Sequence, residues 1–115
     1  MVSLMEGRLS SDILRGHTDT IVLASLQKRD RYGFEIYNCV LQKTNNLYEL
    51  KETTLYSSYK RLEKDGFIES YWGDETQGGR RKYYRITDVG RLLYQQKLKD
   101  YEFTKQILEK LFMEE

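Results

Sequence analysis

The feature that most constrains the fold is a change in residue pattern close to Gly66. Before this glycine, apolar residues recur every three or four positions, which is typical of amphipathic helices. After it, residues 67–72 and 81–86 are rich in aromatic and β-branched side chains, which favour strands. A polar, glycine-containing stretch at residues 73–80 separates them and predicts a hairpin loop.

Three helices are expected before this hairpin. The first spans residues 11–28 and is expected to break near Gly16. The second starts at Tyr32 and ends at the turn-forming residues 44–46. The third spans residues 52–64 and is expected to end at the glycine that follows it. The core side of the second helix is expected to consist of Phe34, Ile36, Val40 and Leu41.

The third helix has two chemically different faces. Leu55, Tyr59 and Leu62 share the side that is expected to face the core. The opposite side carries hydroxyl, aromatic and basic groups, which can contact base edges and phosphates from within the major groove of DNA. A solvated surface face is the alternative interpretation. The expected DNA contacts of this helix are Thr53, Thr54, Tyr56, Ser57, Lys60 and Arg61.

The order helix, helix, helix, strand, strand, helix describes a winged helix-turn-helix, a mainly α fold with a small β-hairpin. The formal net charge is only +1, so the placement of the charges matters more than their sum. A flexible tip with Arg80, Arg81 and Lys82 predicts contacts to the phosphate backbone. The alternative is a charged edge strand that prevents aggregation.

A long final helix is expected from Val89 nearly to the end of the chain, capped by Thr87 and Asp88. Its apolar stripe is longer than one small core needs, which favours dimerisation over folding back on its own chain. A two-fold dimer would bind a pseudo-palindromic operator, with its recognition helices roughly 34 Å apart. The expected dimerisation residues are Leu92, Leu93, Leu98, Tyr101, Ile107, Leu108, Leu111 and Phe112.

The length of 115 residues fits one small domain. We expect a leader or arm at residues 1–10, the winged helix at 11–87 and the dimerisation helix at 88–115. No apolar run approaches the roughly 18 residues of a membrane span, and no signal peptide is evident. With a single cysteine, Cys39, no internal disulfide can form, and a cytoplasmic location fits best.

No residue pattern indicates catalysis, a metal site or a cofactor, so we expect no enzyme. His17 is the sole histidine, and a structural role is expected for it. Cys39 is expected to be a buried, inert thiol, with a redox sensor as the alternative. Trp72, at the end of the first strand, is a candidate for a ligand pocket, with ordinary packing as the alternative.

Over about residues 15–95, the sequence resembles the PadR family of transcriptional regulators. No single segment is specific, but two are specific together: a recognition helix with its exit, and a basic, tyrosine-rich strand followed by Thr87 and Gly90. The segments that carry the resemblance are Arg15-Gly16, residues 21–26 (IVLASL), 32–36 (YGFEI), 54–68 (TLYSSYKRLEKDGFI) and 79–87 (GRRKYYRIT).

The resemblance implies a homodimeric winged-helix repressor that binds double-stranded DNA, the short members dimerising through the C-terminal helix. It also implies a small aromatic or lipophilic effector that lowers DNA affinity, in some members bound at the dimer interface. The sequence departs from the family at Ser57, where proline is common, near His17 and Thr18, where an apolar residue is common, and at Leu50-Lys51-Glu52, which replaces a serine cap. A winged-helix module that binds protein instead of DNA is the alternative.

Overall fold

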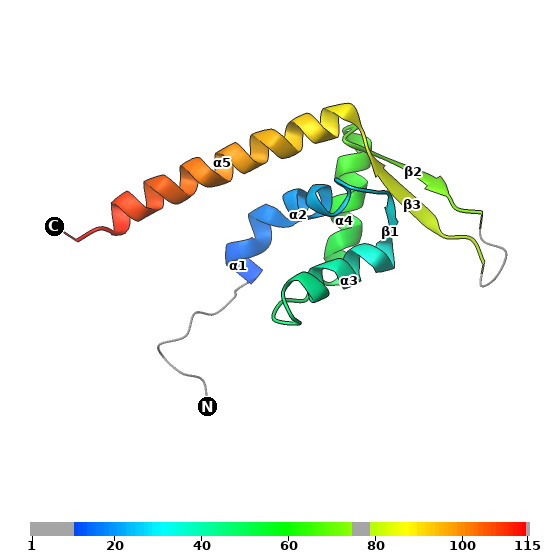
Figure 1. Cartoon of the computed structure of the whole chain (residues 1–115), viewed down its shortest axis with the longest axis horizontal. Coiled ribbons are helices and arrows are strands. Elements are labelled where there is room, and N and C mark those ends of the chain that lie inside the picture. Colours follow the sequence, from blue (N-terminus) through cyan, green and yellow to red (C-terminus); the bar gives the residue numbers. More distant parts are fainter. Residues whose placement is uncertain (1–10, 75–78, 115) are drawn as a thin grey trace.

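The computed structural model describes residues 11–74 and 79–114 (Figure 1). The expected leader at residues 1–10 and the loop residues 75–78 lie outside the described residues. The elements follow the predicted order, with a short 3₁₀ helix and a short strand added. They are α1 (Ser11–Leu14), η1 (Arg15–His17), α2 (Thr18–Ser25), β1 (Arg31–Tyr32), α3 (Gly33–Lys43), α4 (Glu52–Lys64), β2 (Ile68–Trp72), β3 (Lys82–Ile86) and α5 (Asp88–Phe112).

The first predicted helix does break near Gly16. The 3₁₀ turn η1 separates α1 from α2, and α2 ends at Ser25 rather than at residue 28. This break places the N-terminus of α2 beside the middle of α4, where a hydrogen-bonded cluster forms.

The core lies between α2, α3, α4 and one face of the sheet. Ile36 and Val40 are buried in it as predicted, and Leu41 is half-buried. The prediction for Phe34 is wrong, because its side chain is 54% exposed. α3 begins at Gly33, so Phe34 is two positions, about 200°, away from Ile36 around the helix and points outward.

The sheet has three antiparallel strands in the order β1-β3-β2. β2 and β3 form the predicted hairpin, with Ser70 opposite Tyr84 and Trp72 opposite Lys82. The two-residue strand β1 was not predicted, because two residues are too few to show an alternating pattern. It pairs with β3 through Tyr32 and Tyr83, so that the start of α3 is attached to the hairpin.

The turn after α4 joins this helix to both the hairpin and α5. Gly66 adopts the predicted left-handed conformation, with φ of 79°. The N–H of Phe67 donates to the Leu62 carbonyl at 2.9 Å and closes the helix. Thr87 caps α5 by accepting from the N–H of Gly90 at 3.1 Å. A Cβ on Gly90 would lie 2.0 Å from the Phe67 carbonyl oxygen, so α5 starts in direct backbone contact with this turn.

The two halves of α5 have different surroundings. In the first half, Leu93 and Tyr94 pack partly against the core, and Tyr101 meets His17 edge to face at 5.9 Å. The second half projects away from the body of the molecule (Figure 1), and its apolar side chains are exposed, Leu111 by 72%. Across the described residues, no helix combines the length and apolarity that a membrane crossing requires.

Candidate nucleic-acid interface

The two predicted faces of α4 are both present. Leu55, Tyr59 and Leu62 are buried in the core. On the outer side, hydroxyl, aromatic and basic groups project into solvent. The exposed residues of this face are Thr53, Thr54, Tyr56, Ser57, Lys60 and Arg61, which are the six predicted contacts of this helix.

The start of α4 lacks a side-chain cap, since Lys51 occupies the N-cap position and makes no capping hydrogen bond. Backbone geometry alone starts the helix there, with the N–H of Leu55 donating to the Lys51 carbonyl at 3.0 Å. The departure from a serine cap therefore does not displace the helix from its predicted start.

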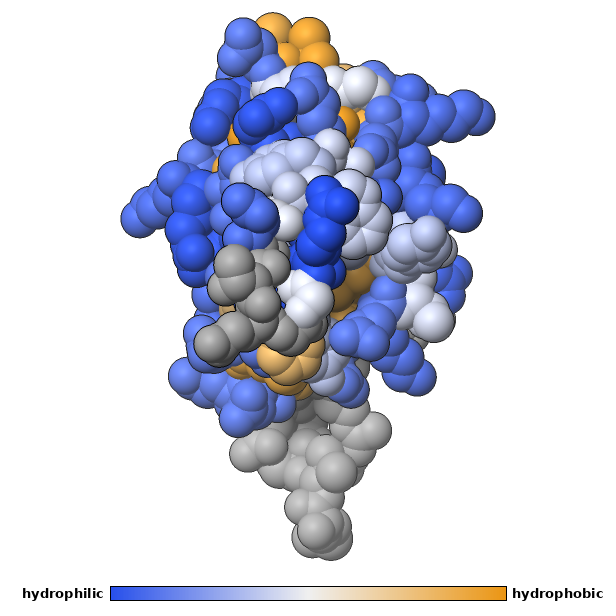
Figure 2. Space-filling view, turned by 90° about the vertical axis from the view of Figure 1, so that its right-hand side faces the viewer, coloured by the Kyte–Doolittle hydropathy of each residue, from blue (hydrophilic) through white to orange (hydrophobic). Residues whose placement is uncertain are grey.

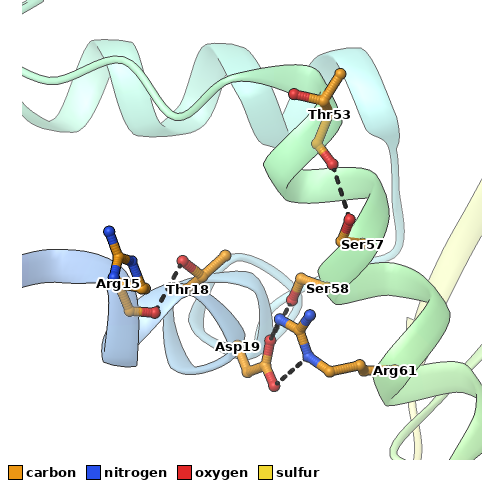
Figure 3. Close-up of polar contacts among 7 residues, drawn as sticks. All are labelled: Arg15, Thr18, Asp19, Thr53, Ser57, Ser58 and Arg61. Atoms are coloured by element: carbon orange, nitrogen blue, oxygen red, sulfur yellow. Dashed lines mark hydrogen bonds and ion pairs between the residues drawn. The ribbon is translucent and has the colours of Figure 1, made fainter. Parts of the chain in front are cut away.

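A polar cluster holds α4 against the N-terminus of α2 (Figure 3). The hydroxyl of Ser58 and the guanidinium of Arg61 donate to Asp19 Oδ1 at 2.6 and 2.7 Å. Partial burial acts to raise the pKa of Asp19, but the hydrogen bonds from Arg61 and Ser58 outweigh it, and the pKa lies below its usual value. The carboxylate is thus charged at neutral pH and fixes the direction of the Arg61 side chain.

A polar cleft of about 330 Å³ lies beside this cluster, between the N-terminal side of α2 and α4. We call it the Arg15 cleft. Two guanidinium-bearing residues, Arg15 and Arg61, line it together with four hydroxyl-bearing residues, Thr18, Thr53, Thr54 and Ser57. Arg61 remains 56% exposed despite its ion pair with Asp19. Guanidinium and hydroxyl groups in this arrangement suit a phosphate group.

The hairpin, which we call the wing (residues 68–86), carries its cations on aromatic faces. Arg80 lies over the Trp72 ring at 5.7 Å and Arg81 over the Tyr32 ring at 4.7 Å. Lys82 lies over the Tyr84 ring at 5.9 Å. Such contacts hold the flexible side chains in place while their charge stays accessible. Figure 2 shows this end of the molecule, where hydrophilic side chains surround paler ones near the centre.

An aromatic groove separates the wing from α4. It encloses about 790 Å³ between the start of α3, the first turns of α4 and β3. We call it the aromatic groove; its rings belong to Tyr32, Phe34, Tyr56, Tyr59 and Tyr84. Trp72 does not line it: this side chain is 57% exposed and contacts Arg80 instead. The structure therefore places Trp72, the predicted ligand residue, outside the aromatic groove.

The profile of the PadR-like family of transcriptional regulators matches residues 22–96. The chain belongs to this family. A transcriptional regulator from Clostridium thermocellum has 50% sequence identity and a TM-score of 0.83, covering 91% of this chain and 99% of its own. An uncharacterized protein of Lysinibacillus sphaericus is 47% identical, over 90% of this chain and 94% of its own length.

More distant structures share the fold. A PadR family regulator from Clostridium difficile R20291 is 33% identical, with a TM-score of 0.72 over 85% of this chain and 100% of its own. PadR from Bacillus subtilis, solved in complex with operator DNA, is 22% identical, with a TM-score of 0.63 over 70% of this chain and 45% of its own. At that identity the likeness concerns the winged-helix fold.

In this PadR-like protein, the structure brings five of the nine predicted α4 and wing residues together around the aromatic groove: Thr53, Tyr56, Ser57, Arg81 and Lys82. Thr54 and Arg61 line the Arg15 cleft instead, and Lys60 and Arg80 line neither. The sequence analysis did not predict the Arg15 cleft, because it considered Arg15 only as part of a segment that carries the family resemblance. It also missed the contribution of Tyr32 and Phe34 to the groove. Their position at the start of α3, the helix that packs against α4, could have indicated this contribution.

Proposed function

We propose that this PadR-like protein is a sequence-specific regulator that places α4 in the major groove of double-stranded DNA. The observation that carries this proposal is the exposed hydroxyl-rich face of α4 with cations on both flanks. Arg80, Arg81 and Lys82 lie on the wing side, and Arg15 and Arg61 lie on the other. A helix in the major groove has a phosphate backbone on each side, so this arrangement supplies cations to both. The operator complex of the Bacillus subtilis fold neighbour supports the proposal.

A hydrogen bond within α4 limits which bases Ser57 can contact. The Ser57 hydroxyl donates to the Thr53 carbonyl at 3.2 Å. With its proton engaged, its oxygen faces outward as an acceptor. Adenine N6 and cytosine N4 are the donors in the major groove. We therefore expect Ser57 to accept from an adenine or a cytosine, and the methyl group of Thr53 to contact a thymine methyl.

The first experiment is a gel shift with DNA from upstream of the protein's own gene, followed by sequencing of co-purified genomic fragments. We expect a specific shift that weakens as salt is raised, because phosphate contacts release counterions. No shift at low salt would contradict the proposal and favour the alternative, a winged-helix module that binds protein.

We propose that the protein is a homodimer joined by the distal half of α5. Leu108, Leu111 and Phe112 continue the face of α5 that covers the core in its first half, but here no described part of the same chain covers them. Leu93 packs against its own core, so it belongs to the monomer. Leu92, about 100° from Leu93 around the helix, lies off this stripe. Leu98, Tyr101 and Ile107 flank or extend it.

Replacing Leu108 and Leu111 with Glu together tests this dimer. Charges in the stripe oppose burial, so we expect the variant to sediment as a folded monomer and to lose most of its DNA affinity, since a dimer binds two half-sites. Leu92→Glu is the control, because Leu92 is about as exposed as Leu111 on the same helix but lies off the stripe. Dissociation by the control and not by the double variant would overturn the placement of the interface.

We also propose that the protein acts in the cytoplasm as a repressor and that a small-molecule effector releases it from DNA. One feature supports the effector: one wall of the proposed DNA-contacting face is an aromatic groove. Measuring transcription of a reporter behind the bound operator, with and without the protein, tests repression; increased transcription would indicate an activator.

A further inference from the structure

Lys60 lies near the centre of the outer face of α4. The buried residues of this helix are Leu55, Ser58, Tyr59 and Leu62. At about 100° per residue, Lys60 points to within about 40° of the direction opposite to them. It lines neither the Arg15 cleft nor the aromatic groove, whereas the cations assigned to the two phosphate backbones lie towards one or the other. With α4 in the major groove, a cation between the two flanks faces the base edges.

A neighbouring ring holds the Lys60 side chain. The ammonium of Lys60 lies 5.3 Å from the centroid of the Tyr56 ring, which is one turn earlier in α4. The ammonium is therefore directed back towards the N-terminal turns of the helix, and these are the turns that contact base edges in helix-turn-helix proteins. The Tyr56 side chain is 54% exposed, so the pair is accessible from outside. Such a contact restrains the lysine while its charge stays available to a second partner.

The chemistry of an ammonium limits the base that Lys60 can contact. An ammonium donates hydrogen bonds and accepts none. In the major groove, guanine presents two neighbouring acceptors, N7 and O6. Adenine presents an acceptor beside a donor, thymine an acceptor beside a methyl group, and cytosine a donor. Guanine is therefore the base that best matches a central lysine on this helix.

We propose that Lys60 is a specificity-determining residue that donates to N7 and O6 of a guanine, and that Tyr56 is the residue that positions it. This inference rests on the proposed DNA-binding function. It adds a donor to the outer face of α4, one turn after the acceptor expected at Ser57, so the binding site should combine a guanine with a nearby adenine or cytosine. The competing role for Lys60 is a phosphate contact, which would raise the affinity for every sequence equally.

The test selects binding sites from a pool of duplex DNA of random sequence, with the full chain and its Lys60→Met variant in parallel. We expect the parent protein to enrich a guanine at one position, and the variant to lower that preference at least five-fold while the other positions keep theirs. Lys64→Met is the matched control, because it makes the same change one turn farther along the exposed side of α4. It should leave the guanine preference unchanged.

Tyr56 is tested separately as the positioning residue. Tyr56→Leu removes the ring beneath the ammonium and should lower the guanine preference. Tyr56→Phe retains the ring and should keep that preference. An unchanged guanine preference in Tyr56→Leu would overturn the positioning role. Circular dichroism checks that each variant is folded.

The outcomes separate this inference from the proposed function. If the parent protein binds no duplex at low salt, the DNA-binding function fails, and the role of Lys60 fails with it. If the parent protein binds selectively but enriches no guanine, or if Lys60→Met retains the guanine preference, only the role of Lys60 is overturned. The same conclusion follows if Lys60→Met weakens binding to all duplexes equally and lowers the salt slope by about 1, because that pattern identifies a phosphate contact.

Discussion

The two flanks of α4 differ in chemistry and in how firmly they are held. On one side, the Arg15 cleft is polar, and a charged hydrogen-bonded cluster around Asp19 fixes it. On the other, the aromatic groove is more than twice as large and is lined by rings and by cations resting on rings. The first flank suits a fixed contact to one phosphate backbone. The second suits contacts to the other backbone through cations that rest on rings.

In the proposed function, this difference gives the two flanks of α4 different roles. Hydrogen bonds to a carboxylate are directional and hold α4 in a single orientation. Contacts between cations and rings are weaker, about 0.5–1 kcal/mol at exposed sites, so the wing side can exchange one partner for another. The cluster beside the Arg15 cleft is therefore expected to keep α4 in place, whereas the wing side is expected to adjust to its partner.

The largest effect on phosphate contacts is expected from the wing. Changing Arg80 and Arg81 to Ala together removes two phosphate contacts, so the slope of log affinity against log salt should fall by about 2. Binding titrations at several salt concentrations measure it. Arg85→Ala is the matched control, because Arg85 lies farther along β3 from the basic tip and is held by Glu69 at 2.7 Å. An unchanged slope in the double variant would show that the wing does not contact phosphates.

The next effect tests the rigid flank through stability. Asp19→Asn removes the negative charge to which Arg61 and Ser58 donate hydrogen bonds. We expect a loss of about 1 kcal/mol in the free energy of unfolding at pH 7. Because the pKa of Asp19 is lower in the folded state, its contribution is present above the usual value of 3.8 and is lost as pH falls through the folded pKa. Denaturant unfolding at pH 7 and pH 3 should therefore show the two proteins converging in acid.

A matched control for this measurement is Glu69→Gln, which breaks the exposed pair between Glu69 and Arg85. Exposed pairs contribute little, about 0–1 kcal/mol, so this variant should stay close to the parent protein. Equal losses in both variants would remove the contrast between a fixed cluster and an ordinary surface pair.

The smallest effect is expected at Arg15. Arg15→Gln removes one cation from the Arg15 cleft, and the salt slope should fall by about 1. Arg29→Gln is the matched control, since Arg29 is exposed and does not line the cleft. If both variants lower the slope equally, the effect is one of overall charge, and the cleft is not a phosphate contact.

The features that could be predicted from the sequence are those that depend on residues close together in the chain. The two faces of α4 follow from the spacing of Leu55, Tyr59 and Leu62, and the wing follows from its aromatic strands and basic tip. Family resemblance added the class of regulator, which the profile match confirms. A long apolar stripe on α5 was predicted too, and its exposure in the distal half was found, while the dimer it suggests stays a prediction.

The remaining features depend on residues far apart in the sequence. The cluster on α4 joins Asp19 to Ser58 across 39 positions, and no local pattern indicates that pairing. The aromatic groove needs α3, α4 and β3 to meet, so Phe34 could be assigned only by where its helix begins. Phe34 was predicted to lie in the core because it is apolar, but its side chain lies on the exposed side of α3.

The close contact at Gly90 has a consequence for the operator. Because a single Cβ there would collide with the Phe67 carbonyl, α5 leaves the turn after α4 in one direction only. In the proposed dimer, that rigid exit sets how far apart the two α4 helices stand and how they are rotated relative to each other. The protein would then select binding sites by the length of the spacer between half-sites as well as by their bases, because an inserted base pair turns one half-site by about a tenth of a helical turn.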